Sequence, residues 1–172
     1  GKNGTVTIST ANTIVNLYTP LIQNATAGTK TISVASSTSY SVGDLIFIIQ
    51  MQGASVNAGK DSIFPDVNSA IPTNTTFGGI TSYNNSGNNE YAQISAVPNS
   101  TTIVLDCDLQ FSYDYIVHVQ VIKVPRYYDL IISGGGSITC PNWNGSTGGV
   151  AVVEIQNNGT LSSTPSFSVT GK

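Results

Sequence analysis

The residues best suited to chemistry lie in one stretch of the chain, and their types point to binding. Trp143, the only tryptophan, stands between Asn142 and Asn144, and Tyr127 and Tyr128 lie shortly before it. Aromatic rings stack on the C–H faces of sugars while amides bind hydroxyls, so this set predicts a saccharide platform. The alternative is structural, because a lone tryptophan in a glycine-rich segment is often a packing anchor. It would then close the first domain or cap the first rung of a repeat.

A second candidate is a pair of carboxylates at the end of an expected strand. Asp106 and Asp108 are two residues apart, so in a strand both side chains point to the same face. With Asp114, or with Asp61 or Asp66, they would offer the hard oxygen ligands that Ca²⁺ prefers. The chain has no dense D-x-D-x-D-G loop, and two aspartates facing solvent at a strand end are the simpler interpretation. No other cofactor is expected.

The two cysteines, Cys107 and Cys140, are 33 residues apart. They either form a disulfide, which an extracellular protein permits, or are two small buried hydrophobic residues, and the sequence leaves both open. Together with a single distant histidine they lack the spacing of a metal site.

The sequence offers only weak candidates for a catalytic group of residues. With nine acidic residues, any two could be nominated as a glycosidase pair. A polysaccharide lyase would need a basic group near its acids, and only His118, Lys123 and Arg126 qualify. We expect His118 in a buried strand as a hydrogen-bonded core residue. No Ser-His-Asp grouping or phosphate-binding glycine loop has the expected context, so we predict a protein that is not an enzyme.

The composition narrows the class of protein further. Of 172 residues, 40% are hydrophobic and only 9% charged, against about 25% in typical soluble domains, so the chain should fold and favours β-structure. The net charge is −3 and the six basic residues are scattered, which argues against a nucleic-acid partner. No apolar run approaches the ~20 residues needed to cross a bilayer, so no membrane span is expected.

The arrangement that would position these residues is all-β. Apolar and polar residues alternate with period two, which predicts strands at residues 5–8, 13–18, 30–34, 45–51, 90–94, 102–105 and 115–124. Gly43 is expected to adopt a positive φ in a tight turn, and Pro125 should end the last strand. We predict a small β-sandwich or barrel-like domain over residues 1–125. Its long segment 53–89, without a clear strand, would cover one face or serve as a contact loop.

Beyond Pro125 the apolar clusters become short and are separated by Gly and Asn turns at roughly ten-residue spacing. This pattern predicts that residues 126–172 form a meander or the first rungs of a parallel β-helix. Because the pattern is unfinished at Lys172, we expect the chain to be part of a longer polypeptide.

Three runs, taken in order, resemble a known family. They are GDLIFIIQMQG at 43–53, VQVIKVPRY at 119–127 and WNGSTGGV at 143–150. Together they are similar to a module of very large bacterial surface proteins, the mobile gliding-motility adhesins of Bacteroidetes exported by type IX secretion. The resemblance covers roughly residues 31–171. The family's arginine-containing glycine-rich segment would follow Lys172 and does not occur in this sequence.

This resemblance implies an exported, extracellular, cell-surface protein used for attachment and gliding, and it assigns no catalytic residue. Its partners would be the type IX secretion and gliding machinery or a surface polysaccharide. Ser62, in Asp61-Ser62-Ile63, resembles the short O-glycosylation motif of these bacteria. Two other functions stay open: a carbohydrate-binding module, and the lead-in of a β-helical polysaccharide-cleaving enzyme.

Overall fold

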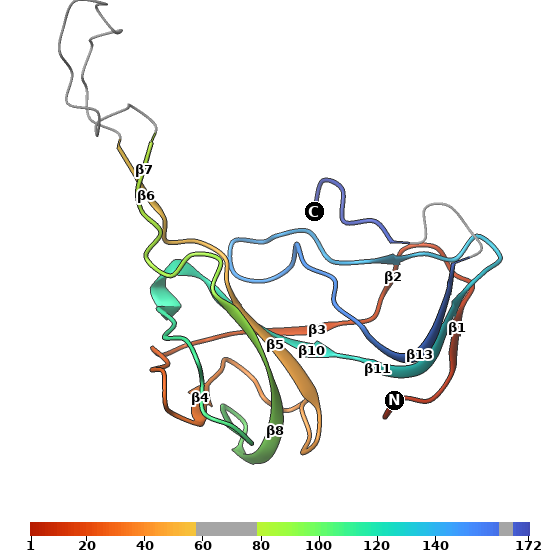
Figure 1. Cartoon of the computed structure of the whole chain (residues 1–172), viewed down its shortest axis with the longest axis horizontal. Helices are drawn as coiled ribbons and strands as arrows, with labels where there is room; N and C mark the ends of the chain where they lie inside the picture. Colours follow the sequence, from red (N-terminus) through yellow and green to blue (C-terminus); the bar gives the residue numbers. More distant parts are fainter. Residues whose placement is uncertain (58–78, 162–166) are drawn as a thin grey trace, which may run out of the picture.

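The computed structural model describes residues 1–57, 79–161 and 167–172, and in these its regular structure is β apart from one 3₁₀ turn. Residues 17–124 contain an antiparallel six-stranded sheet in the order β3-β10-β5-β8-β9-β4. These strands are β3 (Leu17–Pro20), β4 (Thr31–Ser33), β5 (Leu45–Gln50), β8 (Asn89–Asn99), β9 (Thr102–Leu105) and β10 (Val119–Val124). A bridge between Leu21 and Val34 brings the two ends of this order together, so the sheet curls into a barrel (Figure 1).

The two faces of the barrel wall are both apolar where β5 and β10 pair. Ile46 and Ile48 point into the barrel core with Val119 and Val121. The alternate residues, Phe47 with Ile122 and Val124, form a second cluster on the outside. The prediction that the strand ending at Pro125 is covered on both sides is therefore confirmed. Gly43, before β5, has a φ of +81°, as its tight turn requires.

The remaining strands pair in parallel and build a second unit. β1 (Val6–Ile8), β11 (Arg126–Ile132) and β13 (Glu154–Leu161) form one parallel ladder. β2 (Thr13–Ile14) and β12 (Ile138–Thr139) form another, which Ile138 extends by a parallel bridge to Phe167. Parallel pairing between successive turns of the chain identifies these as coils of a β-helix, one of the two expected forms.

The register gives the length of one coil. Tyr127 pairs with Ile155, 28 residues on, and after a register shift Leu130 pairs with Gly159 and Ile138 with Phe167, 29 residues on. The step from Val6 to its partner Leu130 is 124 residues, because the whole barrel is inserted between the first and second coils. Strand pairing thus crosses residue 125, and a division into domains 1–125 and 126–172 stays a prediction.

The segment between β12 and β13 also covers the outer face of the barrel. Val150 and Val152 pack on the cluster that contains Phe47 and Ile122. Asn16, which is buried, donates from its amide to the carbonyls of Lys123 and Val152 at 3.0 and 2.6 Å and accepts from the Val152 N–H at 3.0 Å. The Asn16 side chain therefore joins the end of the first coil to the barrel and to the segment that leads into β13.

Two expectations need correction. Within residues 53–89 no strand was expected, but β6 (Ser55–Val56) and β7 (Ile80–Ser82) pair as an antiparallel ribbon that projects from the barrel (Figure 1). The middle of this segment, residues 58–78, lies outside the described residues. Residues 115–118 were expected to be strand, yet η1 (Tyr115–Val117) is a 3₁₀ turn that ends at His118 with a φ of +64°.

Candidate functional site

The Trp143 loop, residues 141–149, is held in shape by its own hydrogen bonds. The Asn144 side-chain oxygen accepts from the N–H groups of Ser146 and Thr147, both at 2.9 Å. The Gly149 N–H donates to the Pro141 carbonyl at 3.0 Å and closes the loop. Asn142 and Asn144 are both exposed, but the side-chain oxygen of Asn144 is committed to its turn. Of the two predicted amides, Asn142 is therefore the one better placed to reach a ligand.

A buried glutamine fixes this loop to the barrel. Gln120, fully buried on β10, donates from Nε2 to the Gly148 carbonyl at 3.0 Å and accepts from the Gly148 N–H at 2.9 Å. Gly148 has a φ of +106°, and a Cβ there would lie 2.5 Å from the Asn142 carbonyl oxygen. The close approach and the positive φ both require glycine. The loop therefore has one fixed position over the end of β10.

Trp143 is half-buried, and its ring meets His118 edge to face. The two ring centroids are 6.1 Å apart with an interplanar angle of 82°. His118 is half-exposed at the end of η1, so the expectation of a histidine inside a buried strand is wrong. Its left-handed backbone ends the 3₁₀ turn and starts β10. The indole thus keeps a partly open face beside an imidazole.

A hollow of about 780 Å³ lies at the same end of the barrel. It is lined by the turn that follows β7, by Gly53, and by Asp114 and Val117 of the η1 region. The turn supplies almost only hydroxyls and amides, together with Tyr83, which is 67% exposed. Its residues on the hollow are Ser82, Tyr83, Asn84, Asn85, Ser86 and Asn88.

Buried polar groups fix the floor of this hollow as firmly as Gln120 fixes the loop. Gln50, fully buried at the end of β5, donates to the carbonyls of Gln52 and Asn84 at 3.0 and 2.8 Å and accepts from the Asp114 N–H at 3.1 Å. The Asn84 amide donates to the Gly53 carbonyl and to the Ser55 hydroxyl at 3.0 and 2.8 Å. The hollow is therefore formed before any ligand arrives.

The hollow and the Trp143 loop meet at one edge of the β5–β10 pair. Gln50 pairs with Val119 and Ile49 with Gln120, so the two glutamines lie on neighbouring registers and point to opposite faces. Val117 lines the hollow, and the next residue, His118, contacts Trp143. The hollow and the Trp143 loop together place an indole, an exposed phenol and many amides around the start of β10. We name these two parts together the barrel-end surface.

The two predicted tyrosines lie elsewhere. Tyr127 is 7% exposed and belongs to the core of the coils with Ile8 and Leu130, so its ring is not part of a platform with Trp143. Tyr128 is 46% exposed on the outside of the same coils. The six residues of β10, about 20 Å of strand, separate His118 and Trp143 from the start of β11. Trp143 therefore has other neighbours than the two tyrosines that the sequence suggested.

The carboxylate and cysteine candidates do not come together. Asp106, Cys107 and Asp108 are exposed after β9, whereas Cys140 is buried in the coils. Both thiols are free, so the disulfide considered from the sequence is absent. In the described ranges no group of three His, Cys, Asp or Glu side chains could hold a metal ion. Asp61 and Asp66, and the O-glycosylation candidate Ser62, lie outside those ranges.

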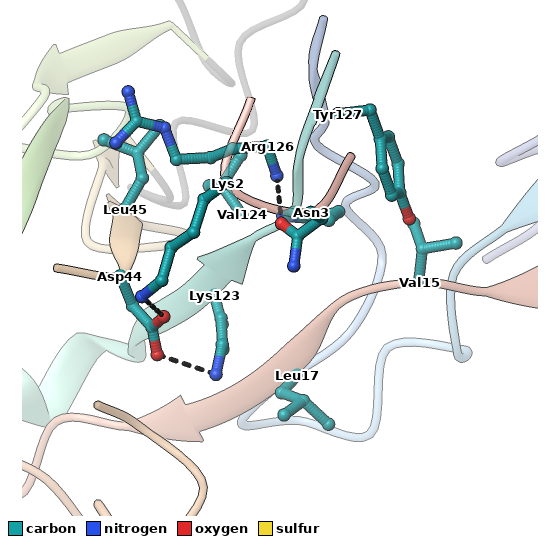
Figure 2. A pocket seen from close by; sticks show the side chains of 11 residues that line it. Lys2, Asn3, Val15, Leu17, Asp44, Leu45, Lys123, Val124, Arg126 and Tyr127 are labelled. Atoms are coloured by element: carbon teal, nitrogen blue, oxygen red, sulfur yellow. Dashed lines mark hydrogen bonds and ion pairs between the residues drawn. The ribbon is translucent and has the colours of Figure 1, made fainter. Parts of the chain in front are cut away.

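A smaller cavity of about 230 Å³ lies where the barrel meets the coils (Figure 2). There the buried Asp44 accepts from Lys2 at 2.8 Å, from Lys123 at 2.7 Å and from the Ser41 N–H at 2.8 Å. Burial alone would raise the pKa of Asp44, but the hydrogen bonds from Lys123, Lys2 and Ser41 outweigh it and lower that pKa. We name the three charged residues, Asp44, Lys2 and Lys123, the ion-pair cluster.

The basic groups nominated for a lyase are separated in space. His118 contacts Trp143 at one end of β10. Lys123 binds Asp44, and Arg126 binds Glu154, at the other end. The three side chains therefore do not meet at one carboxylate.

The residues that build the barrel-end surface from below, Gln50 and Gln120, were not singled out from the sequence. A signal for them exists. Each is an uncharged amide inside a run of apolar strand residues, LIFIIQ and VQVIKV. A buried amide has to find partners, so such a residue marks a place where a loop is fastened.

No family model and no curated protein matches this chain. Similar solved structures include the tailspike gp61 of Pseudomonas phage phi297, with a TM-score of 0.43, 10% identity and coverage of 95% of this chain. The tailspike gp49 of Pseudomonas phage LKA1 has a TM-score of 0.40, 15% identity and 81% coverage. The gp54 tailspike of Acinetobacter baumannii phage AP22, solved with a capsular saccharide, has a TM-score of 0.40, 10% identity and coverage of 91% of this chain. The chain spans between 21% and 27% of those proteins.

No helix in residues 1–57, 79–161 and 167–172 is long and apolar enough to cross a membrane.

Proposed function

We propose that this chain is a saccharide-binding attachment module of an exported cell-surface protein, and that the barrel-end surface holds the sugar. The observation that carries the proposal is the preformed hollow beside Trp143, lined by hydroxyl and amide groups with Tyr83 exposed at its edge. Aromatic rings pack on the C–H faces of a pyranose, and fixed hydroxyl and amide groups orient its hydroxyls.

The rigidity of the surface supports this assignment. Gln50 and Gln120 fix both parts of it through buried hydrogen bonds, so little ordering is left for the binding step. Preorganisation of this kind raises the affinity of a small contact area, because fewer groups lose freedom on binding. A module that attaches through many weak sugar contacts gains from it at each site.

The test is a glycan array with the whole chain, followed by calorimetry on the saccharides that bind. Trp143→Ala and Tyr83→Ala should each weaken binding about 3- to 10-fold, the range that loss of one aromatic contact produces. Tyr128→Ala is the matched control, because Tyr128 is equally an exposed tyrosine but lies on the coils. Silence of the array, or equal losses in the control, would reject the barrel-end surface.

The finer proposal follows the resemblance to gliding adhesins: the parent protein would be a type IX secretion substrate that acts in gliding. An immunoblot of intact cells, with and without external protease, tests it separately. A very large band that protease removes supports it. A band near the size of this chain, protected inside the cell, contradicts it.

A further inference from the structure

The cavity between the barrel and the coils gathers positive charge from distant parts of the chain. Lys2, Lys123 and Arg126 all line it, and these are three of only six basic residues in a protein of net charge −3 (Figure 2). Lys2 comes from the segment before β1, Lys123 from β10 and Arg126 from β11. The insertion of the barrel between two coils is what places them together.

The local charges do not cancel. Arg126 pairs with Glu154, through Nε to Oε2 and through a longer contact of 3.4 Å to Oε1. The two lysines share the single carboxylate of Asp44, one on each oxygen. One positive charge is therefore left over, and the apolar walls of a concave site strengthen its field.

The cavity also holds unused hydrogen-bond donors. Each lysine ammonium has three N–H groups. Lys2 uses two of its N–H groups, one for Asp44 and one for the Val42 carbonyl at 3.3 Å. Lys123 also uses two, one for Asp44 and one for the Ser39 carbonyl at 3.0 Å. Within the described part of the chain, one donor remains on each. Both ammonium groups stay in reach of solvent, with the side chains 45% and 29% exposed.

Asn3 adds a third donor of the same kind. Its Oδ1 accepts from the Arg126 N–H at 2.7 Å, which fixes the amide, and the described residues offer its Nδ2 no acceptor. In Figure 2 the Asn3 amide nitrogen and the ends of Lys2 and Lys123 lie around the same space. The polar part of the cavity therefore offers donors and a surplus positive charge, while the Asp44 oxygens are already occupied.

The rest of the lining is mainly aliphatic. It consists of Val15, Leu17, Leu45, Val124 and Pro125, together with the largely buried aromatic residue Tyr127. A ligand that fits both parts has a carboxylate for the donors and a C–H face for the floor. The volume, about 230 Å³, is below the ~300–1,000 Å³ of pockets for drug-sized molecules, so one small ring fills it.

We propose that this cavity is a second binding site, which takes the carboxylate of an acidic sugar residue through Lys2, Lys123 and Asn3. It is independent of the barrel-end surface, from which the length of β10 separates it. A loss of binding at one site therefore leaves the other intact.

The experiment is an NMR titration of the whole ¹⁵N-labelled chain with D-glucuronate, D-glucose and acetate at an ionic strength of about 20 mM, where screening is weak. Glucuronate should shift the Asn3 side-chain amide and the backbone amides at Lys2 and Lys123 in a saturable way. Glucose should not shift them, and acetate should bind at least several-fold more weakly. Raising the ionic strength to about 150 mM should weaken glucuronate binding.

Two variants sharpen the test. Lys2→Gln keeps the Lys123–Asp44 pair and should weaken glucuronate binding roughly three- to tenfold, as expected for one charge at close range. Asn3→Asp keeps the oxygen that accepts from Arg126 but turns the free donor into an anion, and should abolish binding. Lys30→Gln is the matched control, because the ammonium of this exposed lysine donates to the Asp106 carbonyl on the barrel and lies outside the lining of the cavity.

Three results would overturn the proposal. Glucose shifting the same resonances as strongly would show that charge is not recognised. Acetate binding as tightly as glucuronate would show that no sugar ring is needed. Equal weakening in Lys30→Gln and Lys2→Gln would show a bulk charge effect. Trp143→Ala should leave the shifts of the Asn3, Lys2 and Lys123 amides unchanged, so this test and that of the barrel-end surface can fail separately.

Discussion

The barrel and the coils, which join at Pro125, are stabilised in different ways. In the barrel the strands β8 and β9 form a hairpin, whereas other pairs, such as Gln120 with Pro20, join residues far apart in sequence, and among the described residues fifteen buried side chains form its core. In the coils the first pairing spans 124 residues, and the core there has five buried members among the described residues. The coils also pack on the outer face of the barrel through Val150 and Val152.

This difference indicates that the coils depend on the barrel for their stability more than the barrel depends on the coils. The larger core of the barrel can support itself, whereas a parallel ladder with a small core needs both its stacking and the barrel wall. We therefore expect damage in the coils to stay local and damage in the barrel to spread. The three predictions below test this, from the largest expected effect to the smallest.

The sharpest contrast compares one substitution in each core. Leu130→Ala in the coils and Leu105→Ala in the barrel each remove a side chain that is at most 1% exposed, at a cost of about 2–5 kcal/mol. Hydrogen exchange should show lost protection on β11 and β13 alone for Leu130→Ala, but on both units for Leu105→Ala. Identical exchange patterns for the two variants would mean that the molecule unfolds as one unit.

The second prediction concerns the contact between the first two coils. A Cβ on Gly136 would lie 2.2 Å from the Ile8 carbonyl oxygen, so Gly136→Ala forces these backbones apart and should cost about 1–3 kcal/mol in unfolding free energy. In Gly159→Ala the new methyl meets only the end of the Ile155 side chain at 3.2 Å, which can turn away, and the change should stay within about 0.5 kcal/mol. Urea unfolding measures both. Equal costs would show that the coils are not held this closely.

The third prediction uses pH to probe the ion-pair cluster that ties the N-terminal segment to the barrel. The folded state lowers the pKa of Asp44 below its ordinary value of 3.8, so its contribution is present above pH 3.8 and is lost as the pH falls through the lower folded value. Because both lysines are partly in solvent, we expect about 1 kcal/mol or less at neutral pH. Asp44→Asn should flatten the acid limb of a stability–pH curve. If the acid limb of the curve did not change, the loss of stability at low pH would have to come from other carboxyl groups.

The sequence was informative where contacts are local. The period-two alternation located β5, β9 and most of the barrel, and Pro125 marked the end of β10. The short apolar clusters with Gly and Asn turns indicated a meander or a β-helix, and the parallel pairing shows the β-helix. Their spacing of roughly ten residues corresponds to about three segments in a 29-residue coil.

What the sequence could not give depends on pairing at long range. Nothing in Val6–Ile8 indicates that its partner is Leu130–Ile132 rather than a strand of the barrel. For the same reason Tyr127 was grouped with Trp143, although β10 separates them. The partners that Trp143 does have, His118 and the loop held by Gln120, depend on a left-handed residue and a buried amide. A hydrophobicity pattern reports neither.

The inserted barrel also determines the order in which strands can pair as the chain emerges from the ribosome or a translocation pore. Residues 17–124 contain all the strands of the barrel and can begin to fold once they are out, while Val6–Ile8 has no partner until residue 132 has followed. The first coil must therefore wait as an unpaired strand, and its edge is open to wrong partners during that time. Its brevity, three residues, limits that risk. The finished barrel then brings both ends of the insertion together, so that a closure over more than a hundred residues becomes a short search.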